Sequence, residues 1–198
     1  MTRTDLCQHI EDRSFLDDVH RLVNESFSGK EFRECAALIG YKESGEIGLS
    51  GFVCGDRYSI SDSKMRGLFG KNLDSLAGEE IIGEIHTHPP DERFGLSVGD
   101  IADAARMGSM FREFGDEDWW VCNAQSSGLG DVVVHCGRIS DYAFSSRGRS
   151  RMDDLVHEWF RVQREHRPGF EDRVDDLSRE AFIDFTDERC ATFEWGAS

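Results

Sequence analysis

The chain has 198 residues, 38% of them hydrophobic and 31% charged, and its formal net charge is −16 at pH 7. This composition is typical of a folded globular protein and not of a disordered one. The acidic excess repels nucleic acid and anionic membrane surfaces, which argues against both as partners. No apolar run approaches the roughly 20 residues of a transmembrane helix, and residues 1–12 lack the apolar stretch of a secretory signal. We therefore expect a cytoplasmic protein.

The first half of the chain predicts one helix followed by strands. Apolar residues recur at helical spacing between residues 14 and 27, and Ser28-Gly29 ends that pattern. Residues 61–77 have a weak helical pattern interrupted by glycine, which predicts a short helix or an irregular segment. Three earlier runs are short and apolar, as in an antiparallel meander of strands: 34–41, 47–54 and 58–60.

The second half alternates strands with helices. Residues 81–88 predict a strand that Pro89 ends, and a helix is expected from residue 97 to about 114. Two more strands are expected at 119–122 and 132–136. After residue 145, apolar residues at helical spacing predict two amphipathic helices, separated by a break at Pro168-Gly169.

These elements predict an α+β fold of the α/β/α kind, with a mixed, curved sheet flanked by helices. We expect one main domain over residues 1–143 and a two-helix appendage over residues 144–198. Because isolated amphipathic helices rarely persist alone, the appendage is expected to pack on the first domain. Its helices are also candidates for a homodimer contact or for substrate docking.

Six cysteines are spaced irregularly and form no C-x-x-C pair, which argues against a cysteine-ligated zinc cluster. Several lie in apolar runs, where a free cysteine behaves as a small buried hydrophobe. Disulfides remain an alternative, and the sequence alone does not pair them.

A candidate metal site lies at the end of the strand over residues 81–88. Residues two apart in a strand point to the same face, so His86 and His88 project side by side. Pro89 ends the strand directly after them, and a loop returns the chain to Asp100. Two histidines and one carboxylate with a fourth position left open are typical of a catalytic zinc site. Each motif alone is weak, because an H-x-H pair occurs by chance, but their combination favours the metal site.

Ser97-Val98-Gly99-Asp100 has the form of a capping box that opens a helix, with Ser97 at the N-cap. One interpretation is therefore that Ser97 and Asp100 only cap the helix. The alternative is that they belong to the metal site. Together with His86-Thr87-His88-Pro89, the segment resembles the H-x-H-P…S-x-x-D signature of the JAMM (MPN+) metalloprotease family. Gly83 and Glu84 are similar to the GEWHTHP form of prokaryotic members, and the spacer is one residue longer than the commonest form.

The resemblance covers roughly residues 34–136 and implies a sheet and helices of the MPN/cytidine-deaminase-like kind. It also implies one Zn²⁺ ion held by His86, His88 and Asp100, with Ser97 donating a hydrogen bond to the oxyanion of the reaction. The expected reaction is attack of a zinc-bound water on a peptide or isopeptide carbonyl.

The family pattern further implies an upstream glutamate as general base, and Glu34 at the start of the first strand fits it. Aligning the chain on the glycine of the pattern would instead put Arg33 there, which cannot act as a base. Glu84 points to the same strand face as His86, so it is an alternative base or a group that orients the histidine. Glu31 is a further alternative if it lies in a loop.

The resemblance implies ubiquitin-like modifier proteins and their conjugates as substrates. The enzyme would be either an archaeal desampylase-like protein or a bacterial isopeptidase of a ubiquitin-like system. The alternative is a catalytically silent MPN-type scaffold or interaction protein. The intact trio His86, His88 and Asp100 argues against that alternative, because silent members usually lose these residues.

Overall fold

The computed structural model describes residues 5–29, 31–41, 45–57, 59–61, 63–65, 67–68, 80–89, 95–112, 118–126, 131–165 and 167–194. In chain order the elements are a 3₁₀ helix η1 (Leu6–Gln8), α1 (Arg13–Ser26), β1 (Cys35–Tyr41), β2 (Ile47–Cys54), β3 (Ile81–Thr87), α3 (Val98–Arg112), β4 (Trp120–Ser126), β5 (Val132–Ile139), α4 (Asp141–Phe144), α5 (Ser146–Glu165), α6 (Phe170–Phe185) and β6 (Thr186–Glu194).

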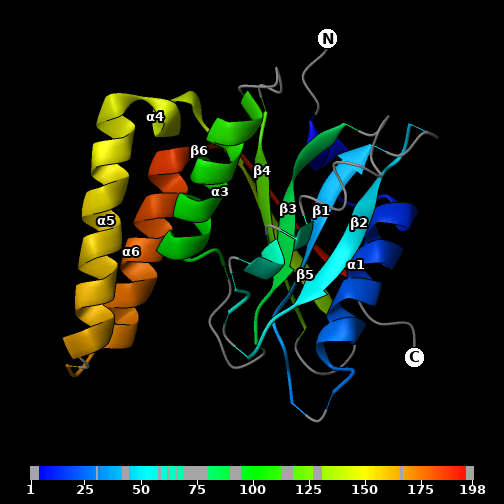
Figure 1. The fold of residues 1–198 in the computed structure, drawn as a ribbon, viewed down its shortest axis with the longest axis horizontal. Helices are drawn as coiled ribbons and strands as arrows, with labels where there is room; N and C mark the ends of the chain where they lie inside the picture. Colours follow the sequence, from blue (N-terminus) through cyan, green and yellow to red (C-terminus); the bar gives the residue numbers. More distant parts are fainter. Residues whose placement is uncertain are drawn as a thin grey trace.

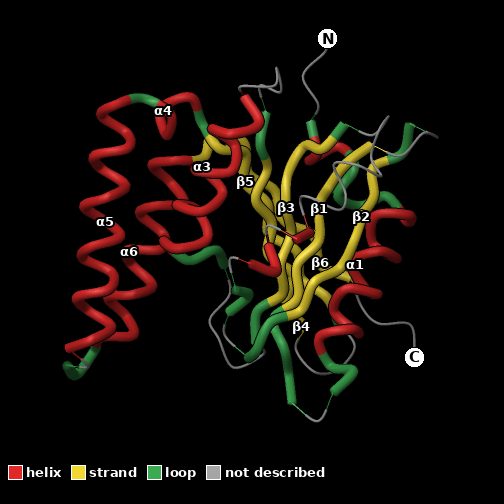
Figure 2. The backbone as a smooth tube through the Cα atoms, viewed as in Figure 1, coloured by secondary structure: helices red, strands yellow, loops and turns green. Residues whose placement is uncertain are grey.

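The six strands form one mixed sheet in the order β2-β1-β3-β4-β5-β6. Only β3 and β4 are parallel, and α3 connects them, whereas the other neighbours run antiparallel. A parallel pair needs such a crossover because its strands start at the same edge of the sheet. The mixed α+β class expected from the sequence is confirmed (Figure 2).

Helices cover both faces of the sheet (Figure 1). The α1 face is packed by the apolar stripe of α1, which includes Phe15, Val19 and Leu22. Asp18 on the same helix is also buried, and its Oδ2 accepts a hydrogen bond of 2.9 Å from the backbone N–H of Leu49 in β2. The charge is thus tied to the edge of β2, which offsets the free energy cost of burying it.

The opposite face, called the α3 face here, is covered by α3, and the α5–α6 hairpin packs against α3 (Figure 1). Buried residues of α3, α5 and α6 belong to one hydrophobic cluster with residues of the sheet, among them Ile101, Leu155 and Leu177. The described residues after 144, namely 145–165 and 167–194, therefore share a core with the preceding part of the chain. They also share its sheet, because β6 pairs with β5 directly after α6 ends.

Several local expectations are confirmed and one is wrong. The expected helices and strands match α1, β1, β2, β3, α3, β4, β5, α5 and α6. Ser59 and Ile60 do not form the strand expected at 58–60, because Asp56 Oδ1 accepts a hydrogen bond from Ser59 N and holds a turn there. Within 61–77, residues 63–65 and 67–68 are helical, and most of the remaining segment lies outside the described residues.

All six cysteines pair in three disulfides, Cys7–Cys190, Cys35–Cys54 and Cys122–Cys136. Two of these join residues directly opposite each other on neighbouring strands. All six cysteines lie in or against the hydrophobic cluster of the α1 face. The thiols are thus disulfide-bonded there, and not free hydrophobes. Among the described helices, none has the length and apolarity needed to cross a membrane.

Candidate metal centre

The candidate metal centre lies on the α3 face, where the carboxyl ends of β3 and β4 meet the beginning of α3. The sheet register places His86 between Ala36 of β1 and Asn123 of β4. Strand alternation brings His88 to the same face one step further, and both imidazoles are buried, at 7% and 8% exposure. The pairing of His86 and His88 expected from strand parity is therefore present.

The three expected ligands converge at distances that suit one ion. The Nε2 atoms of His86 and His88 are 3.0 Å apart, and each is 3.4 Å from a different carboxylate oxygen of Asp100. In tetrahedral geometry, ligands about 2.0–2.1 Å from zinc lie about 3.3 Å from one another. The His–His and His–carboxylate distances thus approach the spacing of tetrahedral zinc ligands, and one ligand atom from each residue lies within 4.8 Å of the others. Three such residues leave a fourth position for another ligand. Among the described residues, this is the group of His, Cys, Asp and Glu side chains that could hold a metal ion.

Asp100 is fixed by the beginning of its own helix. Its Oδ2 accepts a hydrogen bond of 2.6 Å from the backbone N–H of Ser97, and Ser97 Oγ accepts one of 3.2 Å from the N–H of Asp100. This reciprocal pair is the capping box that the sequence predicts. Because a hydroxyl accepts and donates at once, the cap leaves the Ser97 hydrogen free for another acceptor.

Thr87, between the two histidines, holds the strand from the opposite side. Its Oγ1 accepts a hydrogen bond of 2.9 Å from Cys35 N and lies 2.7 Å from Ser26 Oγ of α1. Thr87 and Ser26 are buried at 1% and 0% exposure. The end of β3 is thereby tied both to the start of β1 and to α1, so that the two imidazoles have a rigid backbone beneath them.

The electrostatics of the trio favour a cation. Burial lowers the pKa of His86, but the charge and hydrogen bond of Asp100 and the charges of Glu34 and Glu84 outweigh it and raise the pKa to about 9. Burial raises the pKa of Asp100, but His86 and His88 hold it well below its usual range. Asp100 is therefore ionised at neutral pH, as a metal ligand must be.

Glu34 lies directly before β1, at the same end of the sheet as the histidines. Its backbone is paired with residues 55–56, through bonds of 2.7 Å to Asp56 O and 2.8 Å from Gly55 N. Alternation along β1 places it on the face of Ala36, which is directly opposite His86. Its charge contributes to the raised pKa of His86, which is consistent with this proximity. Arg33, the residue of the rival alignment, instead forms a surface ion pair of 3.6 Å with Glu25.

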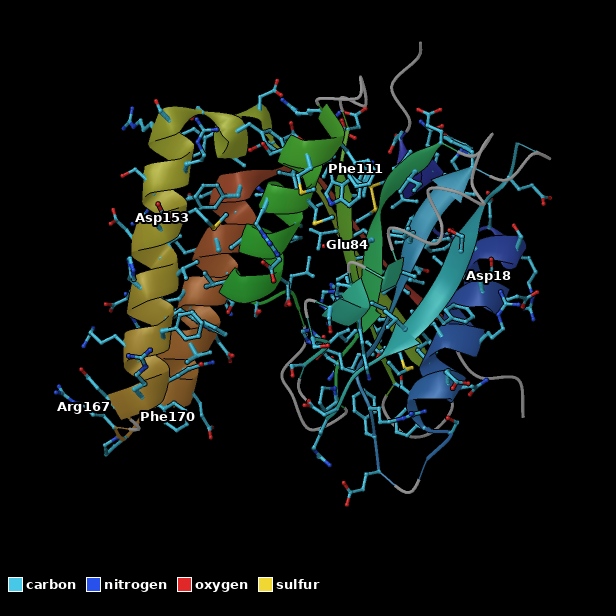
Figure 3. The ribbon with its side chains drawn as sticks, viewed as in Figure 1. Asp18, Glu84, Phe111, Asp153, Arg167 and Phe170 are labelled. Carbon is cyan, nitrogen blue, oxygen red and sulfur yellow. A yellow bond between two sulfur atoms is a disulfide. The ribbon has the colours of Figure 1, made fainter. Side chains whose placement is uncertain are left out.

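Glu84 lies two residues before His86 on the same face of β3, between β3 and α3 (Figure 3). It is buried at 6% exposure, and its Oε2 has no hydrogen-bond partner among the described residues. Desolvation by burial, which is opposed by His86 and assisted by Asp103 and Asp100, raises its pKa to about 7. A carboxyl so buried is suited to orienting its neighbour His86 more than to meeting a substrate.

One residue from the α5–α6 hairpin approaches the site. A Cβ placed on Gly99, within the S-x-x-D turn, would lie 3.7 Å from Cη2 of Trp159 and 3.4 Å from Ser97 Oγ. Trp159 of α5 thus contacts the first turn of α3 close to Ser97. Phe160 packs edge-on against Trp159, with ring centroids 5.1 Å apart, and is 45% exposed. The sequence gives no sign of a site role for Trp159, because the apolar pattern of α5 does not reveal which turn of α3 it contacts.

His135 lies in β5 opposite Asn123 and is half-buried. Burial lowers its pKa, so the ring is neutral at pH 7. In the register it is two strands away from His86, so it is outside the trio of ligand atoms.

Comparison with known proteins adds no assignment, since no protein-family model and no curated protein matches the chain.

Proposed function

We propose that the chain is a zinc-dependent isopeptidase of the JAMM (MPN+) type, which removes ubiquitin-like modifier proteins from their conjugates. The observation that carries this proposal is the convergence of His86, His88 and Asp100 at ligand distances beside a capping box that leaves the Ser97 hydroxyl able to donate. The sheet order and the α3 crossover support an MPN-like fold, and the motif resemblance supports the substrate class.

In the proposed reaction each residue of the site has a role that its position supports. A zinc ion held by the trio would lower the pKa of water and polarise the scissile carbonyl. Glu34, on the same face as His86, takes the proton of the attacking water and returns it to the leaving amine. Ser97 donates a hydrogen bond to the oxygen of the carbonyl as negative charge develops on it. Glu84, buried on β3 beside His86, orients the imidazole of His86.

The direct test is cleavage of a modifier joined by an isopeptide bond to a lysine of a target protein. The purified chain is incubated with the conjugate, and free modifier is followed on a gel with zinc present and with a chelator present. We expect cleavage with zinc and none with the chelator. Wild-type protein that binds no zinc would refute the metal centre and favour a silent MPN-type scaffold.

The general base is tested by Glu34→Gln, which keeps the shape of the side chain but removes its basicity. Turnover should fall by about 10²–10⁴-fold, the usual contribution of general acid–base catalysis, while zinc content stays at the wild-type level. Glu31→Gln is the matched control, since Glu31 is exposed three residues earlier and should be dispensable. Near-normal turnover by Glu34→Gln would show that another group is the base.

A further inference from the structure

Two buried amides of β4 contact the connection that separates the histidine pair from Asp100. Asn123 and Gln125 are at 0% and 1% exposure and alternate on the α3 face of the strand. Val121, the preceding residue of β4 on that face, is apolar and belongs to the hydrophobic cluster, whereas Asn123 lies between His86 and His135 in the register. Burying two amides at this place costs free energy unless they form hydrogen bonds.

Each amide holds one end of the connection. Gln125 Nε2 donates a hydrogen bond of 3.0 Å to the carbonyl of Pro89, the residue after His88. Asn123 Nδ2 donates one of 3.4 Å to the carbonyl of Gly95, two residues before Ser97. The backbone N–H of His88 also donates to Ala124 O, at 3.3 Å, between the two amides. β4 is thus the element to which both ends of the connection are bound.

Gly95, whose carbonyl accepts the hydrogen bond of Asn123, has an unusual backbone conformation. Its φ is 126°, a conformation that residues with side chains rarely adopt, and it turns the chain toward Ser97 and the start of α3. The relative placement of His88 and Asp100 therefore depends on two carbonyls that are held from one strand. Oδ1 of Asn123 is buried and has no hydrogen-bond partner among the described residues, which destabilises the folded state. A smaller apolar side chain at this position would not have this desolvation penalty.

We propose that Asn123 and Gln125 are positioning residues, which set the affinity of the site for its metal by fixing the two ends of the connection between His88 and Asp100. This inference rests on the proposed metal centre. Metal sites depend on such supporting contacts, and their loss typically weakens metal binding by about 10–100-fold. The bond of Gln125 is the shorter, so its removal should have the larger effect.

The test measures the Kd for Zn²⁺ alone, by competition with a chromophoric chelator and without any substrate. We expect Gln125→Ala and Asn123→Ala to weaken zinc binding by about 10–100-fold, the first more than the second. Arg138→Met is the matched control. Arg138 is also buried, at 5% exposure, and bonds Asp118 and Asp187 on the same sheet away from the site, so its loss should lower the Tm and leave the Kd unchanged.

The near-isosteric variants Gln125→Glu and Asn123→Asp separate positioning from packing and from charge. Each replaces the donating amide by a carboxylate and adds a negative charge that would by itself attract Zn²⁺. Weaker zinc binding in these variants, at a temperature well below each Tm, supports positioning. Wild-type or tighter Kd values in both the alanine and the acidic variants would overturn it. A wild-type protein that binds no zinc would overturn the metal centre and this inference together.

Discussion

Asp100 both caps α3 and faces the two histidines, and the sequence motif is compatible with either role. Its Oδ2 accepts from Ser97 N while its two oxygens lie 3.4 Å from the two imidazoles, so the same carboxylate begins α3 and faces the histidines. Strand parity and the S-x-x-D spacing predict this convergence. They do not predict Thr87, Asn123 and Gln125, because a polar residue inside an apolar strand shows that a partner is needed without showing which carbonyl or hydroxyl it is.

Replacing Asp100 by Asn should abolish tight zinc binding. The amide keeps the size of the side chain and its hydrogen bond from Ser97 N, but it lacks the negative charge that a zinc ligand supplies. We expect less than one-tenth of the wild-type zinc content after dialysis, measured by atomic absorption. Asp103→Asn, one turn further along the same helix and exposed, is the control and should retain its zinc. Full zinc content in Asp100→Asn would remove Asp100 from the ligand set.

Glu84 should make the stability of the metal-free protein depend on pH. Its folded-state pKa of about 7 lies above the ordinary value of 4.5, because burial disfavours the charged form. The stability contribution of the protonated carboxyl is thus complete below pH 4.5 and is lost as the pH rises through about 7. The loss amounts to about 3 kcal/mol in the free energy of unfolding.

The variant Glu84→Gln stays neutral at every pH, so in urea titrations of chelator-treated protein it should be more stable than wild type above pH 7. The two proteins should converge toward pH 4.5. Glu46→Gln on the exposed edge near β2 is the control and should follow the wild-type curve. Parallel curves for Glu84→Gln and wild type would contradict a buried, neutral Glu84.

At the scale of elements, long periodic segments were predictable and the last strand was not. The apolar stripes of α1, α5 and α6 and the runs of β1, β3 and β5 carry clear patterns. β6 begins directly after α6, and its residues Asp187, Glu188 and Arg189 are charged, as in many edge strands, so its sequence lacks the apolar alternation of a strand. Its place is determined by tertiary pairing with β5.

The contact between α5 and α3 leads to a prediction about substrate binding. Trp159 lies beside Gly99 and Ser97, so its ring is close to where a scissile carbonyl would meet the Ser97 hydroxyl. We expect Trp159→Ala to raise KM for a protein conjugate several-fold, with little change in zinc content. Trp159→Phe should recover most of the loss, because it restores an aromatic ring.

Ile183→Ala is the control for Trp159→Ala, because Ile183 is a 54% exposed apolar residue on α6. Steady-state kinetics on the conjugate measure the effect, and thermal unfolding of each variant reports any loss of packing. An unchanged KM in a folded Trp159→Ala protein would show that α5 supports α3 without contributing to substrate binding.

For the whole molecule, the candidate metal ligands and the disulfides lie on opposite faces of the sheet. The candidate ligands lie on the α3 face, whereas the six cysteines lie on the α1 face as three disulfides. The sequence could not pair these cysteines, since pairing depends on which strands become neighbours. Disulfides persist mainly in oxidising compartments and in hyperthermophiles, so they favour conditions different from those of an ordinary cytoplasm.

Loop length predicts unequal contributions from the disulfides. Cys7–Cys190 closes a separation of 183 residues and Cys122–Cys136 one of 14 residues. The entropy of the unfolded chain then gives about 5 kcal/mol for the first and about 3 kcal/mol for the second. The paired substitutions Cys7→Ala/Cys190→Ala should therefore lower the free energy of unfolding more than Cys122→Ala/Cys136→Ala, in urea titrations without reductant. A larger loss from the Cys122–Cys136 pair would contradict this order.

The Cys7–Cys190 bond also turns the backbone between η1 and β6 into a closed covalent ring. A protease that cuts one exposed loop of this ring opens it without releasing a fragment, because both new ends stay joined through the sulfur bridge. The nicked molecule keeps its two pieces at high effective concentration, so it retains the pairing of β5 with β6 and the packing of the hairpin. Such a cut is invisible on a non-reducing gel and separates into two bands only after the bridge is reduced.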